Sequence, residues 1–303
     1  MPKAVQSTDD APENLRPYLF HGVEVGWRDG RKEAIGDCPF CGRESKFSVV
    51  VQTGQWRCLV CNEGQDSGKA IRGGNAHVFI RKLWEYSEKA TKDYSDLVKG
   101  RGYLDDLCLI QWEIVKSITT GNWLVPGYGA DGHMNQLYKY LRSPIPTPTL
   151  GHQLYGVNLY DSSKSTVYLC EGPWDGIALW EMLGQAKETE NGLSPTGNSA
   201  NSLLADANVL AVPGCGTFLE SWLPLFAGKV VNLCYDNDHP RKNPKTGAAI
   251  PPGALEGMKR AARILSESPE PPESIHYIRW GKDDHVNLSL EHGHDVRDWL
   301  NNA

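Results

Sequence analysis

The sequence lacks any run of about 18 apolar residues, the length that a helix needs to cross a bilayer. Residues 1–14 are polar and contain no apolar core of a signal peptide. We therefore expect a cytoplasmic protein with no membrane partner. The 303 residues leave room for two or three domains with a sizeable core.

Positive charge is also scarce. The net charge is −6, and residues 161–303 hold 19 of the 37 acidic residues but only 12 of the 31 basic ones. Binding to a nucleic-acid backbone would then have to rest on local basic patches, and it would weaken with salt. The eight cysteines of this intracellular chain favour metal ligands or free thiols over disulfides.

Four of these cysteines form two C-x2-C pairs with sixteen residues between them: Cys38, Cys41, Cys58 and Cys61. Each pair is typical of a tight turn that presents two thiolates on one side, and two pairs make a closed tetrahedral zinc site. Residues 47–51 and 55–57 predict a hairpin between the pairs, with its turn at residues 53–54. We interpret the segment as a zinc ribbon with a structural zinc, because four thiolates leave no open position. The alternatives are a redox pair or chance spacing.

The ribbon could also contact nucleic acid. Four residues near the cysteines are the candidates: Arg43, Lys46, Trp56 and Arg57. The alternative is an ordinary solvated face and one core tryptophan.

Acidic residues follow two predicted strands farther along the chain. Residues 167–170 predict a buried strand that ends at Glu171, and a helix follows with Asp175 in its first turn. Residues 230–235 predict a second buried strand that ends at Asp236 and Asp238. Open α/β sheets bind ligands at the carboxyl ends of their strands, so these carboxylates are expected in one crevice.

Two carboxylates about 4 Å apart repel each other by about 1 kcal/mol in water and by about 4 kcal/mol at an effective dielectric of 20. A hard divalent cation relieves this repulsion, and oxygen ligands favour Mg²⁺ or Mn²⁺. The alternative is that the acids cap helices or lie on solvated loops.

Strands and helices alternate through residues 161–303, which predicts an α/β core with a mostly parallel four-stranded sheet and helices on both faces. Two polar insertions, at 188–202 and 239–253, interrupt it. We predict a zinc-ribbon domain over 1–85, a linker over 86–100, a small α+β subdomain over 101–160 and the α/β domain over 161–303. In the subdomain, Lys139 and Arg142 could hold phosphates, or they could be ordinary surface cations.

The acidic motifs, in their order along the chain, resemble the TOPRIM fold, which DnaG-type primases, topoisomerases and some nucleases share. They are Glu171-Gly172-x-x-Asp175, Gly214-x-Gly216-Thr217, Asp236-x-Asp238 and Lys282-Asp283. Residues 139–144 (KYLRSP) with 153–156 (QLYG), and the zinc module with its CPFC, WRCLVC and GNA segments, are similar to the DnaG-type primases in particular. The resemblance covers roughly residues 36–300.

Members of this family make short RNA primers on single-stranded DNA from ribonucleoside triphosphates. The resemblance implies that Glu171, Asp236 and Asp238 bind catalytic Mg²⁺ or Mn²⁺. It implies supporting roles for Asp175 and for Asp283 or Asp284, and it matches Lys139 to the family's catalytic lysine. Phosphates of nucleotide or template would lie near three cations: Lys139, Arg142 and Lys282. We expect a monomer in a bacterial cell or a phage-infected host, with a replicative helicase as a candidate partner.

The sequence departs from the family at several positions. Cys41 stands where the bacterial zinc domain usually has histidine, Arg142 replaces an asparagine, and the 239–253 insertion follows the acidic pair directly. No helicase domain follows residue 303, which indicates a stand-alone primase of a phage or mobile element, or the primase half of a longer protein. A TOPRIM nuclease is one alternative, against which the zinc module and Lys139 argue. A non-catalytic replication or origin-binding module is another, against which the intact acids argue.

Overall fold

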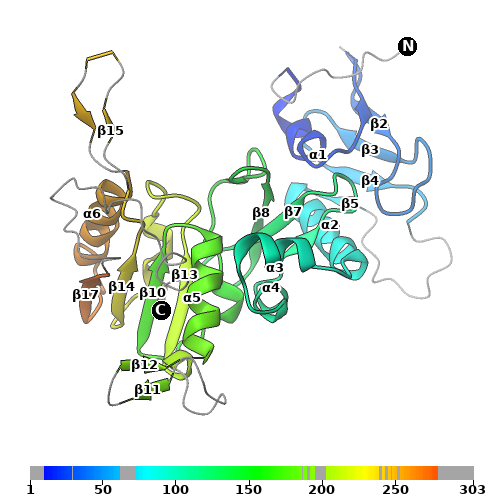
Figure 1. The fold of residues 1–303 in the computed structure, drawn as a ribbon. Helices are drawn as coiled ribbons and strands as arrows, with labels where there is room; N and C mark the ends of the chain where they lie inside the picture. The colour runs from blue at the N-terminus through cyan, green and yellow to red at the C-terminus, as the bar shows by residue number, and fades with distance from the viewer. Residues whose placement is uncertain are drawn as a thin grey trace. The chain divides into compact units, whose positions relative to one another are not determined.

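The chain forms two compact units in the computed structural model (Figure 1). Unit 1 comprises residues 1–93, 113–126 and 134–152, and unit 2 comprises residues 94–112, 127–133 and 153–303. The structure describes residues 10–28, 30–61, 73–185, 187–189, 192–194, 203–238, 241–242, 245–246, 248–250 and 253–278. Among these residues, no helix is both long and apolar enough to span a membrane. The predicted domain limits at 85, 100 and 160 remain predictions.

Unit 1 contains a five-stranded antiparallel sheet in the order β1-β2-β3-β4-β5. Its strands are β1 (Val25–Gly26), β2 (Glu33–Gly36), β3 (Phe47–Val50), β4 (Trp56–Cys58) and β5 (Gly73–Gly74). The β3–β4 pair is the predicted hairpin, and Gly54 in its turn has a φ of +67°, which glycine adopts without strain.

Apolar residues on the inner face of this sheet pack against three helices and a second sheet. The helices are η1 (Glu13–Leu15), α1 (Arg16–Phe20) and α2 (Ala76–Ala90). The second sheet has the order β6-β7-β8-β9, with β6 (Val115–Lys116), β7 (Trp123–Tyr128), β8 (Met134–Tyr140) and β9 (Pro144–Ile145). Asn75 caps α2, because its side-chain oxygen accepts a hydrogen bond from the Val78 backbone N–H at 3.1 Å. The aromatic centre of unit 1 consists of Tyr18, Phe40, Phe47, Trp56 and Phe79.

His21 is completely buried in unit 1. Its Nε2 lies 2.8 Å from the Thr147 hydroxyl oxygen, and that hydroxyl donates to the Leu137 carbonyl. The Thr147 oxygen must therefore accept a hydrogen bond from a protonated Nε2, which leaves Nδ1 unprotonated and with no partner among the described residues. Burial, aided by the charge of Lys139, lowers the pKa of His21 to about 3.

This buried histidine makes unit 1 sensitive to acid. The unfolded chain takes up a proton near pH 6.5 and the folded chain does not, so stability falls as the pH drops below 6.5. The loss is about 1.4 kcal/mol per pH unit. We expect His21→Gln to flatten this slope between pH 6.5 and 5 in urea unfolding of the zinc-loaded protein. His152→Gln, at an exposed site of unit 1, is the control and should keep the wild-type slope. Equal slopes for His21→Gln and wild type would contradict the assignment.

Unit 2 is built on a four-stranded sheet in the order β13-β10-β14-β17, and every neighbouring pair is parallel. The strands are β10 (Thr166–Cys170), β13 (Ala207–Ala211), β14 (Val230–Cys234) and β17 (Ser274–Tyr277). From β10 the chain crosses to β13 at one edge, and from β14 it crosses to β17 at the other. Right-handed crossovers in opposite directions place their helices on opposite faces of the sheet, as Figure 1 shows for α5 (Pro173–Gln185) and α6 (Gly253–Ser266).

Among the described residues of unit 2, the other helices are α3 (Ser95–Arg101), α4 (Leu107–Gln111), η2 (Val157–Leu159), η4 (Leu203–Ala205) and η5 (Glu220–Leu225). Two short antiparallel strand pairs lie at or within the polar insertions: β11 (Lys187–Thr189) with β12 (Gly192–Ser194), and β15 (Arg241–Lys242) with β16 (Ala249–Ile250). η5 is a short 3-10 helix, and Pro224 lies inside it.

These observations confirm the predicted fold class. The parallel four-stranded sheet with its helices corresponds to the α/β core. The separate antiparallel sheets and the cysteine cluster described below correspond to the smaller α+β part and the zinc ribbon.

Candidate functional sites

The four cysteines of the two C-x2-C pairs converge in unit 1. Their sulfur atoms all lie within 4.8 Å of one another. Cys38 Sγ lies 3.5 Å from Cys61 Sγ, and Cys41 Sγ lies 3.7 Å from Cys58 Sγ. Zinc–sulfur bonds of about 2.3 Å in a tetrahedron separate the sulfurs by about 3.8 Å, so the cluster fits zinc. The predicted structural zinc is supported on the chemistry and spacing of its ligands.

Backbone turns hold the first pair of thiols in place. The Gly42 N–H donates to the Cys38 carbonyl at 2.9 Å, and the Cys38 N–H donates to the Arg43 carbonyl at 3.0 Å. At the second pair, the Val60 N–H points at Cys58 Sγ over 3.4 Å. Such N–H groups stabilise a thiolate, which is the form that binds zinc.

Without metal, the cluster does not release all its protons easily. Burial raises the pKa of Cys38 to about 11 and, together with the neighbouring thiols, raises the pKa of Cys61 further. Burial also acts to raise the pKa of Cys58. The hydrogen bonds that Cys58 receives from the Val60 N–H and from the neighbouring thiols outweigh burial, so the pKa of Cys58 is lowered. Zinc binding must therefore displace protons, and zinc affinity must fall as the pH falls.

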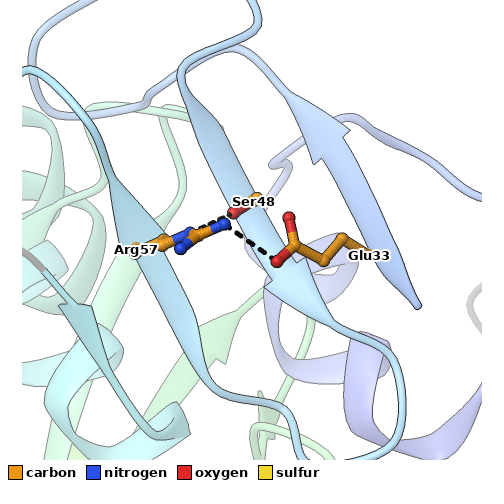
Figure 2. Close-up of polar contacts among 3 residues, drawn as sticks. All are labelled: Glu33, Ser48 and Arg57. Carbon is orange, nitrogen blue, oxygen red and sulfur yellow. Dashed lines mark hydrogen bonds and ion pairs between the residues drawn. The ribbon is translucent and has the colours of Figure 1, made fainter.

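Arg57 lies on the outer face of the five-stranded sheet. Its guanidinium forms a 2.9 Å ion pair with Glu33 and donates from Nε to the Ser48 hydroxyl at 3.3 Å, across three neighbouring strands (Figure 2). The Arg57 side chain remains 59% exposed. Exposed ion pairs contribute little, about 0–1 kcal/mol, so Arg57 can exchange Glu33 for a phosphate at low cost. Arg43 and Lys46 are exposed as well.

Trp56 differs from the other three candidates for nucleic-acid contact. Its side chain is only 2% exposed and stacks on Phe47 with ring centres 5.4 Å apart. Its indole N–H donates to the Asn75 carbonyl at 3.2 Å. Trp56 is therefore a core tryptophan, which was the alternative to a contact with nucleic acid.

In unit 2, the predicted acids gather at the carboxyl ends of β10 and β14, which are neighbours in the sheet. Glu171 follows β10, and its Oε2 lies 3.4 Å from the Asp236 backbone N–H beyond β14. Asp238 accepts a 2.9 Å hydrogen bond from the Ala254 N–H in the first turn of α6. Asp175 lies in the first turn of α5, folded back near Gly172, and is 7% exposed.

The pKa of Glu171 is shifted by this environment. Burial raises its pKa to about 7, with further contributions from the charges of Asp238 and Asp175, although the Asp236 N–H acts in the opposite direction. A bound divalent cation would offset both the repulsion between these carboxylates and the cost of ionising buried Glu171. This carboxyl group is therefore suited to be a metal ligand.

The raised pKa of Glu171 has a cost in stability that can be measured. The folded state holds the proton more tightly than the unfolded state, so stability falls as the pH rises from 4.5 to 7, by on the order of 3 kcal/mol. In buffer free of Mg²⁺ and Mn²⁺, we expect Glu171→Gln to be more stable than wild type at pH 8 and equal to it at pH 4.5. Thermal unfolding checks this, with Glu267→Gln at an exposed site in the turn directly after α6 as the control. A variant no more stable than wild type at pH 8 would refute it.

The loop after β13 contributes a residue that the sequence analysis did not single out. Cys215 lies beside the acids, close enough for its thiol to hydrogen-bond Glu171. The loop is tied to α6, because Arg260 donates to the carbonyls of Gly216 at 3.0 Å and Phe218 at 2.7 Å. A Cβ on Gly257 of α6 would lie 2.2 Å from the Cys215 carbonyl oxygen, so only glycine permits this approach. The sequence feature that pointed to this loop was the Gly-x-Gly-Thr motif of residues 214–217, which follows the end of β13.

The remaining predicted residues are placed as follows. Lys139 belongs to unit 1, where its Nζ donates to the Phe20 carbonyl at 2.5 Å and lies 4.1 Å from the centre of the Phe20 ring. Burial lowers the pKa of Lys139. Arg142 is exposed. Lys282, Asp283 and Asp284 lie outside the described residues. Within the described part of the chain, only the four cysteines bring three or more potential metal ligands within 4.8 Å of one another.

Comparisons with known proteins give distant likenesses. No protein-family model and no curated protein matches the sequence. Among solved structures, the zinc-binding and RNA polymerase domains of the Aquifex aeolicus primase are 14% identical, with a TM-score of 0.43, over 97% of this chain and 82% of that one. The primase fragment of the bacteriophage T7 primase-helicase protein is 12% identical, with a TM-score of 0.41, over 88% and 94%.

A third solved structure holds the bacteriophage T7 lagging-strand DNA polymerase interacting with the primase domains of two gp4 subunits bound to an RNA/DNA hybrid and dTTP. The match to it is 14% identical, with a TM-score of 0.32, over 66% of this chain and 78% of that one. At such identities and TM-scores, we base the functional proposal on the residues of this chain alone.

Proposed function

We propose that this protein synthesises short RNA primers on single-stranded DNA by metal-dependent nucleotidyl transfer. The observation that carries the proposal is the placement of Glu171, Asp236 and Asp238 at the carboxyl ends of two neighbouring parallel strands. The order of the motifs supports a primase in particular, because a four-cysteine cluster and the Lys139 segment precede these acids. A TOPRIM nuclease would need neither.

Each acid has a role in this proposal. Glu171, Asp236 and Asp238 hold Mg²⁺ or Mn²⁺, while Asp175 and one of Asp283 or Asp284 support them. The bound metal would bind the triphosphate, activate the primer 3′-hydroxyl and stabilise the leaving pyrophosphate. The chain itself prepares the site: the Asp236 N–H orients the Glu171 carboxylate, and the N-terminus of α6 orients Asp238.

Cations of the chain would bind the substrates. We assign Lys139 as the catalytic lysine and Arg142 and Lys282 as phosphate contacts. Arg43, Lys46 and Arg57 would hold the template on the ribbon. The proposed substrates are single-stranded DNA and ribonucleoside triphosphates, and the candidate protein partner is a replicative helicase. We further propose a monomer in the cytoplasm, from a phage or mobile element.

Primer synthesis on single-stranded DNA of mixed sequence tests the proposal. Labelled ribonucleotides, Mg²⁺ or Mn²⁺ and the zinc-loaded protein should give short RNA products that disappear without template. The same reactions on supercoiled DNA measure nicking. The absence of product with either metal, from protein with stoichiometric zinc, would overturn the proposal, and nicking in its place would favour the nuclease.

A further inference from the structure

Lys82 of α2 is a buried cation surrounded by aromatic rings. Its side chain is only 8% exposed. Its Nζ lies 5.2 Å from the centre of the Phe40 ring, 5.8 Å from that of Trp56 and 5.8 Å from that of Tyr86. Three ring faces within about 6 Å of one ammonium make an aromatic cage. Lysine is seldom buried to this extent in proteins.

The cage borders the cysteine cluster. Phe40 lies between the two cysteines of the first C-x2-C pair, and Trp56 is two residues before Cys58. Tyr86 is close enough to the cluster for the thiolates of Cys61, Cys38 and Cys41 to add to the effect of burial in raising its pKa. All three rings that contact Lys82 therefore line the surroundings of the zinc ligands.

The loaded cluster carries excess negative charge. Four thiolates and one Zn²⁺ sum to a charge of −2, and two of the four cysteines, Cys38 and Cys58, are buried. Such a dianion is stable in a protein interior only if positive charge or N–H groups lie near it. The three rings that flank the cysteines lie with their centres 5.2–5.8 Å from the Lys82 ammonium, and Lys82 is buried from water.

We propose that Lys82 is the counter-cation of the zinc site. Its ammonium, positioned by Phe40, Trp56 and Tyr86, offsets part of the charge of the zinc tetrathiolate and slows the loss of zinc. This role links α2 to the ribbon by electrostatics as well as by packing, and it does not depend on the proposed primer synthesis.

The test uses the full-length, zinc-loaded protein and measures zinc transfer to a competing chromogenic chelator. Lys82→Met keeps an unbranched apolar stem of nearly the same length and removes the ammonium group, whereas Lys82→Arg keeps the charge. We expect Lys82→Met to weaken zinc binding by about tenfold, the lower end of the range for residues that surround metal ligands, and Lys82→Arg to stay near wild type.

Lys89→Met is the matched control. Lys89 is also on α2, and its Nζ also lies 5.8 Å from the Tyr86 ring centre, but its side chain is exposed. It should bind zinc like wild type. Co²⁺ substitution gives a second readout, since the cobalt–thiolate absorption shows whether all four sulfurs still bind. Wild-type zinc affinity in Lys82→Met would overturn the proposal, as would an equal loss in Lys82→Arg with the four-sulfur cobalt spectrum intact.

Discussion

Cys61→Ser is expected to lose its zinc and, with it, the ordered structure of the five-stranded sheet in unit 1. Structural zinc contributes roughly 10–16 kcal/mol of binding free energy to small zinc domains, which exceeds what short strands can supply. Two of the five strands here, β1 and β5, are only two residues long, so the sheet depends on the cross-link that the metal makes. Metal analysis and the fluorescence of the buried Trp56 would report the two losses.

Cys215→Ser is the control for this experiment. Cys215 and Cys61 are both partly exposed, but Cys215 lies in unit 2, outside the cluster. It should retain one zinc per chain. Stoichiometric zinc in Cys61→Ser would show that the cluster is not the zinc site. Zinc loss from wild type should also speed up as the pH falls, since the thiols then compete with the metal for protons.

Asp236→Asn and Glu171→Gln are expected to lower primer synthesis by at least about a hundredfold, because removing a metal ligand costs more than the 10–100-fold typical of residues that only surround a metal. Each substitution keeps the shape of the side chain and removes one negative charge from the crevice. Binding to single-stranded DNA should change little, since neither residue supplies positive charge. Labelled product per enzyme, with Mg²⁺ and with Mn²⁺, is the measurement.

Asp131→Asn is the control for the two acids. Asp131 is an exposed acid of unit 2 in the turn that follows β7, where its carboxylate accepts a hydrogen bond from the His133 N–H. Asparagine can accept the same bond, so activity should remain at the wild-type level. Full primer synthesis by Asp236→Asn and Glu171→Gln would exclude metal binding by these residues, whatever the fold.

Local patterns predicted much of this structure. The C-x2-C spacing predicted the cluster, the turn at Gly54 predicted the β3–β4 hairpin, and apolar runs that end in acids predicted β10 and β14. In each case, the information lies within about ten residues, and the physical cause is a turn or a buried strand. The meeting of Glu171 with Asp236 also followed, because neighbouring parallel strands end at the same edge of a sheet.

Features that depend on distant parts of the chain could not be predicted. β1 and β5 are too short to carry an apolar pattern, and only their pairing defines them. The Lys139 ammonium binds the carbonyl of Phe20, 119 residues away, which no local pattern indicates. Trp56 would look the same in the sequence whether it faced solvent or the core. Its burial follows from the packing of α2 and Phe47.

The discontinuous make-up of unit 1 has a consequence for how the protein emerges from the ribosome. Thr147 contacts His21, and Leu137 belongs to the same core as the buried cysteines. Both residues are synthesised more than a hundred residues after His21. Unit 1 therefore cannot finish folding until residue 152 has left the exit tunnel. Domains normally fold as they are made. Here the nascent zinc ribbon remains incompletely folded until the later core residues of unit 1 are synthesised. A chain truncated near residue 85 would lack those residues, so its core would stay incomplete.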